Sequence, residues 1–137
     1  MVRAIVTDRF FLSQRSGKAT KDDLQAAQDL RDTLAALQSR CVGLAANMIG
    51  VRKCIIAFLN ERGEIEVMLN PVITQKMLPY QALEGCVALK GAREVNRWQV
   101  ISVRYQDEQM QTCEQMLSGM PAQTIQHEID HLCGILV

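Results

Sequence analysis

The composition of this 137-residue chain has no surplus of charge and no long apolar run. Fifteen Lys and Arg residues balance fifteen Asp and Glu residues, which argues against nucleic acid or an anionic membrane as the main partner. No apolar run approaches the roughly 20 residues that a membrane-spanning helix needs. Repeats, linkers and low-complexity stretches are also missing. We therefore expect one domain over residues 1–137, with no membrane and no direct nucleic-acid partner.

The cysteines do not form the pattern of a disulfide framework. There are five, an odd number, and they lack the dense spacing of disulfide-rich secreted domains. Charged residues come as early as Arg3 and Asp8, unlike the apolar segment of a signal peptide. We therefore expect reduced thiols and a cytoplasmic location.

Two helices are predicted, one in each half of the chain. The segment from Thr20 to Asp23 resembles a capping box, and apolar residues follow it at helical spacing to about Arg40. The second helix should begin near Pro121, a residue favoured in the first turn, and stop at Gly134, a residue favoured just past a helix end. The N-terminal helix is therefore amphipathic, and the C-terminal one is expected at the centre of the fold.

Short strands are predicted between the two helices. Turn-forming residues separate the members of two strand pairs. The expected strands are 53–59, 65–73, 98–105 and 110–116. The predicted class is α+β, with short antiparallel strands around a central C-terminal helix.

That C-terminal helix carries the only two histidines, in the motif His127-Glu128-Ile129-Asp130-His131. The histidines are one turn apart, so they leave the same face and can bind one ion. Glu128 lies about 100° round from His127, within reach of a water on that ion. A Lewis acid and an adjacent base are what metal-assisted hydrolysis needs. The alternative is an ordinary amphipathic helix with two hydrogen-bonded histidines.

A third metal ligand is missing from this helix. Cys133 lies about 200° round from His131 by helix geometry, so it points away from the site. We expect the ligand upstream, in the segment Glu84-Gly85-Cys86 or the residues just after it. Glycine lets the backbone come close there, and a thiolate suits a site with two histidines.

Three segments together resemble the signature motifs of the peptide deformylase family, which removes the N-formyl group from nascent polypeptides. They occur in the family's order at compatible separations, and the resemblance covers roughly residues 20 to 137. The three segments are Gly43-Leu44-Ala45-Ala46, Glu84-Gly85-Cys86 and Gln126-His127-Glu128-Ile129-Asp130-His131. The implied partner is an N-formylmethionyl peptide or nascent chain, including one still on the ribosome.

The resemblance also implies roles for individual residues. Cys86, His127 and His131 would hold one divalent ion, generally Fe²⁺ in this family and often Zn²⁺ or Ni²⁺ in preparations. Glu128 would be the general acid and base, and the backbone N–H of Val87 would serve the oxyanion. The residues expected to bind the substrate are Gly43, Leu44, Met48, Leu89 and Ile125.

Two acidic residues near the motifs each allow two interpretations. Glu84 either has a structural role, orienting the loop that carries Cys86 or pairing with a nearby arginine, or is a solvated loop carboxylate. Asp130 is either a partner of Arg93 or Arg97, or an exposed helix residue.

The chain also departs from the family pattern. The first motif usually reads Gly-x-Gly-Leu-Ala-Ala-x-Gln, and here Cys41 replaces the first glycine and Met48 replaces the glutamine. That glutamine donates a hydrogen bond to the developing oxyanion, and losing one such donor costs about 10²–10³ in rate. Asn47 carries an amide, but strand periodicity would point it to the other side. Ala88 replaces the usual serine or threonine of the second motif.

Two functions follow from these observations. One is a deformylase, in which water attacks the formyl carbon while Glu128 moves the proton. The other is a weak or inactive relative that binds metal and formylated N-termini or inhibitors, as Met48 and Ala88 suggest. A protein that needed only the metal would have no evident use for Glu128, so we predict the enzyme.

Overall fold

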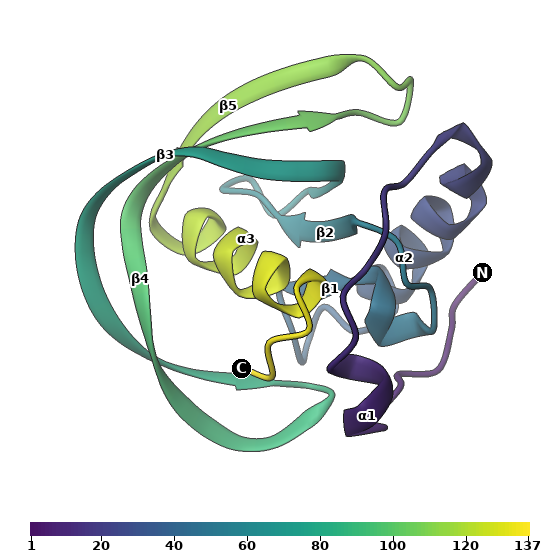
Figure 1. The fold of residues 1–137 in the computed structure, drawn as a ribbon, viewed down its shortest axis with the longest axis horizontal. Helices are drawn as coiled ribbons and strands as arrows, with labels where there is room; N and C mark the ends of the chain where they lie inside the picture. Colours follow the sequence, from purple (N-terminus) through teal and green to yellow (C-terminus); the bar gives the residue numbers. More distant parts are fainter.

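A five-stranded antiparallel sheet bends around one helix in the computed structural model, which describes residues 1–137 (Figure 1). The enclosed helix is α3, Gly119–Leu132. The strands lie in the sheet in the order of the chain: β1 Gly43–Ala45, β2 Ile55–Leu59, β3 Ile65–Cys86, β4 Leu89–Gln106 and β5 Thr112–Ser118. These elements and the helices confirm the predicted α+β class.

The predicted N-terminal helix is present in two parts. A 3₁₀ turn, η1 (Lys21–Asp23), leads into α2 (Leu24–Ala36). The capping box forms, since Thr20 accepts a hydrogen bond from a backbone N–H and its own N–H donates to Asp23. The helix ends four residues earlier than the periodicity predicted, at Ala36. A shorter helix, α1 (Arg9–Leu12), precedes it.

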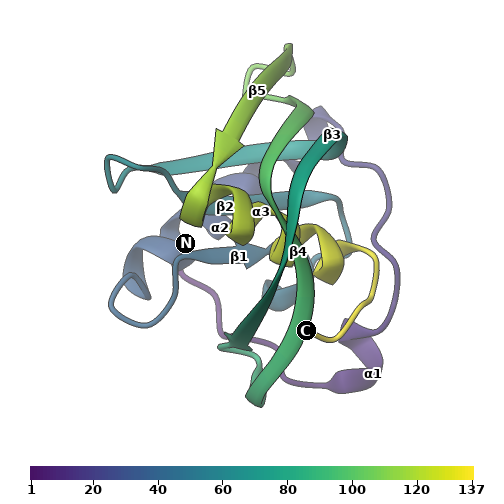
Figure 2. The same ribbon diagram turned by 90° about the vertical axis from the view of Figure 1, so that its left-hand side faces the viewer.

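Strands β3 and β4 are much longer than predicted. The sequence pattern suggested strands only at 65–73 and 98–105, but the ladder continues to the pair Cys86 and Leu89. Most side chains between 74 and 83 are exposed, so this part lacks the apolar alternation that reveals a strand. Register shifts interrupt the pairing, and the hairpin curves round α3 (Figures 1 and 2).

The C-terminal helix lies where the sequence placed it. It begins two residues before Pro121, and Gly134 follows it with a φ of 79°. A Cβ on Gly134 would lie 2.3 Å from the carbonyl oxygen of Ser13. Glycine is therefore required both by the backbone conformation and by the close packing against the N-terminal segment.

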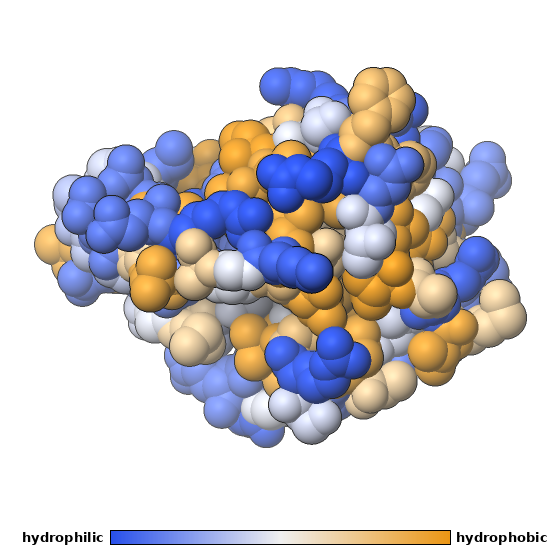
Figure 3. Space-filling view, turned by 90° about the horizontal axis from the view of Figure 1, so that it is seen from below, coloured by the Kyte–Doolittle hydropathy of each residue, from blue (hydrophilic) through white to orange (hydrophobic).

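Helix α2, the sheet and α3 share one hydrophobic core of 25 buried residues. Leu30 from α2, Phe58 from β2, Ile101 from β4 and Ile125 from α3 are completely buried in it. On the surface seen from below, polar side chains interrupt the apolar ones (Figure 3). None of the helices combines the length and the apolar character needed to cross a membrane. All five cysteines are unpaired.

Candidate active site

Helix α3 presents both histidines to the inside of the curved sheet. The Nε2 atoms of His127 and His131 lie 3.0 Å apart, close to the ~3.3 Å that two bonds of 2.0–2.1 Å make at a tetrahedral angle. Both side chains are buried. The spacing of one helical turn thus brings two nitrogen atoms to one point.

Cys86 reaches the same point from the end of β3. Its sulfur and the ligand atoms of the two histidines all lie within 4.8 Å of one another. The N–H of Ala88 donates a hydrogen bond to this sulfur at 3.4 Å. Cys133 is exposed at the end of α3. One sulfur and two imidazole nitrogens fit a single divalent ion in a four-coordinate site with one position open.

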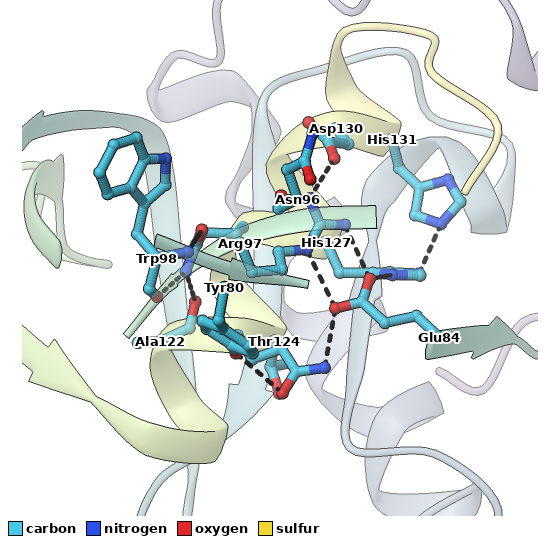
Figure 4. A network of polar contacts seen from close by, with 12 residues as sticks. Tyr80, Glu84, Asn96, Arg97, Trp98, Ala122, Thr124, His127, Asp130 and His131 are labelled. Atoms are coloured by element: carbon cyan, nitrogen blue, oxygen red, sulfur yellow. Dashed lines mark hydrogen bonds and ion pairs between the residues drawn. The ribbon is translucent and has the colours of Figure 1, made fainter. Parts of the chain in front are cut away.

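A buried carboxylate, Glu84, orients the first histidine (Figure 4). Its Oε1 accepts hydrogen bonds from Nδ1 of His127 at 2.8 Å and from Nη2 of Arg97 at 2.7 Å. Burial alone would raise the pKa of Glu84, but the hydrogen bonds from His127, Arg97 and Gln123 outweigh it and lower the pKa to about 2. An ionised Glu84 fixes the proton of His127 on Nδ1 and leaves Nε2 free to bind a metal.

Arg97 links the carboxylate of Glu84 to α3, the metal helix, which carries His127 and His131. Its Nε donates to Oε2 of Glu84 at 3.0 Å, and its Nη1 donates to Asp130 at 2.8 Å. Arg97 is only 5% exposed, so its ion pair with the buried Glu84 is shielded from water, whereas the side chain of Asp130 is partly exposed. The structure therefore decides both open interpretations: Glu84 is a paired, buried carboxylate, and the partner of Asp130 is Arg97 and not Arg93.

The two histidines differ in their other ring nitrogen. Nδ1 of His127 is hydrogen-bonded to Glu84, whereas Nδ1 of His131 is buried without a partner. Burial disfavours the charged form of His127, but its hydrogen bonds to Cys86 and Glu84 outweigh that and raise its pKa. Burial and the nearby charge of His127 lower the pKa of His131. When no metal is bound, His127 is therefore the histidine that takes up a second proton and becomes positively charged.

Glu128 stands apart from this network. It is 4% exposed, and its Oε1 has no hydrogen-bond partner. Burial raises the pKa of Glu128 to about 7. A buried carboxyl without a partner costs stability, and a pKa near neutrality suits a group that both takes and returns a proton.

A cavity of about 670 Å³ opens onto these groups. One wall carries Cys86 and His127 together with Glu84 and Glu128, and the other carries Met48 and Gly43, while His131 is fully buried beside His127 and does not line the cavity. Apolar, exposed side chains stand at the mouth, with Val42 41%, Leu83 70% and Met120 60% exposed. The remaining lining residues are Gln38, Ser39, Arg40, Cys41, Gly85, Val87, Gln123 and Thr124.

The residues expected to bind the substrate divide into two groups. Gly43 and Met48 line the cavity, as does Val87. The expected apolar walls Leu44, Leu89 and Ile125 do not; they are 0%, 8% and 0% exposed and belong to the core. Neighbouring residues on a strand point to opposite faces, and Ile125 lies about 200° round the helix from His127. The apolar lining comes instead from the mouth of the cavity.

The first motif has an unexpected backbone. Residues 46–49 form a 3₁₀ helix, η2 (Ala46–Ile49), and not a strand. Asn47 is buried, and its side-chain N–H donates to the carbonyl of His131 at 2.9 Å, so its amide is not available to the cavity. The Met48 sulfur accepts a hydrogen bond from the N–H of Ala45. No side-chain amide from this motif therefore faces the cavity.

Gly43 is needed where β1 passes α3. A Cβ there would lie 2.4 Å from Cγ2 of Thr124 and 3.1 Å from a carboxylate oxygen of Glu128. The absent side chain thus lets the strand approach the metal helix and leaves Glu128 its place.

Sequence reasoning missed several cavity residues. Gln123 precedes His127 by four positions, so the helical spacing already placed both on one face. Leu83 and Arg40 gave no such signal, because the segments that carry them enter the cavity only through the tertiary fold.

A thiolate and two histidines beside a buried carboxyl, in a cavity enclosed by a curved sheet, define a metal-dependent hydrolase site. The comparisons with known proteins agree. Residues 5–137 match the family described as polypeptide deformylase. A peptide deformylase of Clostridium beijerinckii is 46% identical over 137 residues, which is 100% of both chains.

Solved structures give the same result. The class I type b peptide deformylase of Acinetobacter baumannii bound to Met-Ala-Ser has a TM-score of 0.87 and 26% identity, over 99% of this chain and 97% of that one. The peptide deformylase of Thermus thermophilus has a TM-score of 0.84 and 32% identity, over 99% and 83%. This chain belongs to the polypeptide deformylase family, metal-dependent enzymes that remove N-formyl groups from nascent peptides. The comparisons favour the enzyme over the inactive binder.

Proposed function

We propose that this protein hydrolyses the formyl amide of N-formylmethionyl peptides and releases formate and a free amino terminus. The observation that carries the proposal is the unpartnered carboxyl of Glu128, which shares a cavity with Cys86 and His127, two of the three residues whose ligand atoms converge. A purely structural metal site has four protein ligands and no need for such a group.

Cys86, His127 and His131 would hold the ion. We propose Fe²⁺, with Zn²⁺ or Ni²⁺ as substitutes, because thiolate and imidazole ligands suit all three. Held by these three residues, the ion would supply Lewis-acid chemistry and would lower the pKa of a bound water. The hydrogen bond from His127 to Glu84 keeps the ligand nitrogen directed at the ion.

Glu128 moves the proton. Its carboxylate accepts a proton as water oxygen attacks the formyl carbon, and returns it to nitrogen as the C–N bond breaks. The water oxygen ends in formate, and the peptide leaves as an amine. A pKa of about 7 makes both directions of this transfer possible near neutral pH.

A backbone N–H would donate a hydrogen bond to the oxyanion that forms on the formyl oxygen. Val87 lies in the two-residue loop between β3 and β4, lines the cavity and follows the ligand Cys86. Its N–H is the donor we propose, because Met48 offers only a thioether. One donor instead of two predicts a working but slower enzyme.

The methionyl peptide would enter past the apolar mouth formed by Val42, Leu83 and Met120. The likeness to a relative bound to Met-Ala-Ser supports a peptide that begins with methionine. We further propose that the substrate is met in the cytoplasm as a nascent chain on the ribosome, where five unpaired cysteines would remain reduced.

The test is formate release from formyl-Met-Ala-Ser by protein purified without oxygen, with the metal content measured on the same sample. Acetyl-Met-Ala-Ser is the matched control substrate, because the added methyl group crowds the reacting carbon. We expect one Fe²⁺ per chain and turnover of the formyl peptide alone. Full metal occupancy without any formate would refute the enzyme and favour the binder.

A further inference from the structure

Gln123, which donates a hydrogen bond to Glu84, accepts one in turn from the hydroxyl of Tyr80. We propose that these two are positioning residues that hold Glu84, and through it His127, in the geometry that binds the metal. The inference rests on the proposed ligands Cys86, His127 and His131, and assigns a role to two further residues that do not bind the ion.

The hydrogen bonds have a defined direction. An ionised carboxylate only accepts, so the group of Gln123 that lies 2.8 Å from Oε2 of Glu84 must be its NH₂. The carbonyl oxygen of Gln123 then faces the hydroxyl of Tyr80 at 3.2 Å, so Tyr80 must donate. A flip of the amide would place its carbonyl oxygen against the carboxylate of Glu84 and break that hydrogen bond. The chain Tyr80–Gln123–Glu84–His127 therefore has one consistent arrangement.

Gln123 and Tyr80 lie on α3 and β3, the two elements whose relative position sets how close Cys86 lies to the two histidines. Gln123 is on α3, one turn before His127, and Tyr80 is on β3, four residues before Glu84 and on the same strand face. The amide thus joins the metal helix to the strand that ends in Cys86. A shift of β3 along α3 would move Cys86 away from the histidines and would break this connection first.

Gln123 has a second contact that Tyr80 lacks. Its side chain lines the cavity, whereas Tyr80 lies outside it. A change at Gln123 could therefore disturb substrate binding directly, whereas the hydroxyl of Tyr80 lies outside the cavity and has its only hydrogen bond to Gln123. Tyr80→Phe is for this reason the cleaner variant.

A second hydrogen-bonded group of one tyrosine, one glutamine and one glutamate lies away from the metal site and serves as a control. Gln115 donates to Glu66 at 3.0 Å and to the hydroxyl of Tyr105 at 2.6 Å. Tyrosine, glutamine and glutamate are again combined, here between β3, β4 and β5, and none of them contacts a histidine. Tyr105→Phe and Gln115→Met remove the same chemical groups as the test variants.

The experiment measures the dissociation constant for Zn²⁺ by chelator competition in each variant, so no activity is needed. Gln123→Met keeps the length of the side chain but loses both hydrogen bonds, and should weaken Zn²⁺ binding about 10-fold. Tyr80→Phe should weaken it about 3-fold. The double variant should match Gln123→Met alone, because Tyr80 acts through Gln123. Gln115→Met and Tyr105→Phe should leave the Zn²⁺ affinity unchanged.

Three outcomes would overturn the proposal: unchanged affinity in Gln123→Met, equal losses in the test and control variants, or an effect of Tyr80→Phe that persists without Gln123. Tyr80→Phe removes one oxygen and retains the ring, so it tests the proposal even if Gln123→Met folds poorly. Cys86→Ala separates the two levels of inference. If it also binds Zn²⁺ as tightly as the wild type, the ligand assignment itself fails; if it alone loses the metal, only the positioning role fails.

Discussion

The cavity has two walls, and they are built from different kinds of contact. On the side of α3 and the β3–β4 hairpin, Glu84 receives hydrogen bonds from His127, Arg97 and Gln123, and Arg97 also binds Asp130. On the side of β1 and η2, the cavity meets Gly43 and the thioether of Met48, without a side-chain amide from the motif.

The difference separates two requirements of the reaction. Metal ligands must be held in place before the substrate arrives, and several hydrogen bonds to one carboxylate achieve this. Stabilisation of the transition state needs donors that point at charge which exists only during the reaction. The wall of α3 and the β3–β4 hairpin has its full set of hydrogen bonds, whereas the wall of β1 and η2 lacks the amide donor of the family's glutamine. Changes to the first wall should therefore abolish function, and changes to the second should adjust the rate.

The largest effect is expected from Cys86→Ala. Two imidazoles alone hold a divalent ion poorly, so stoichiometric metal binding should be lost. Metal content after dialysis, measured by atomic spectroscopy, is the readout. Cys133→Ala is the control, because Cys133 is exposed and lies outside the ligand group. Equal metal content in both variants would show that another residue is the third ligand.

Glu128→Gln should keep the metal and lose the chemistry. The amide has the shape of the carboxyl but cannot accept a proton, so turnover should fall about 100-fold or more. Steady-state formate release at measured metal occupancy tests this. A fully loaded variant with unchanged turnover would assign the proton transfer to another group.

The same substitution should stabilise the metal-free protein at alkaline pH. The pKa of Glu128 is raised to about 7 in the fold from the usual 4.5, so the folded state binds more protons than the unfolded state between these values. Wild-type stability should therefore fall as the pH rises from 4.5 to 7 and stay low above it. At pH 8, Glu128→Gln should be more stable by about 2–3 kcal/mol.

Denaturant unfolding of both metal-free proteins at pH 5 and pH 8 measures this gain. The advantage of the variant should be small at pH 5 and largest at pH 8. A constant difference between the two pH values would mean that ionisation of Glu128 is not the cause.

Met48→Gln tests the wall of the cavity formed by β1 and η2, where the family's glutamine is absent. A side-chain donor at this position should raise kcat about 10-fold by stabilising the oxyanion, with less change in KM because the bond strengthens mainly in the transition state. An amide that misses its partner would instead cost about 1–3 kcal/mol of stability. Formate release at matched iron occupancy is the measurement. High wild-type activity without any gain would show that Val87 N–H, or another donor, already suffices.

Local patterns in the sequence were enough to predict the metal-binding group. The helical spacing of His127 and His131 sets their common face, whatever surrounds the helix. The Glu-Gly-Cys segment offered a thiolate on a backbone that can approach closely. The capping box, the final helix and the α+β class also followed from contacts between residues near in sequence. In each case the determining interaction is local, so the sequence carries it directly.

The tertiary structure alone decided the rest. The long hairpin of β3 and β4 was missed because its exposed residues show no apolar alternation; the ladder and the curvature round α3 sustain it. The 3₁₀ backbone at Asn47 depends on how this segment packs against α3, where the carbonyl of His131 accepts a hydrogen bond from the Asn47 amide. The partners of Glu84 lie 13 to 43 residues away along the chain. Hydrogen bonds over such separations form only once the sheet has closed round the helix, and no local pattern encodes them.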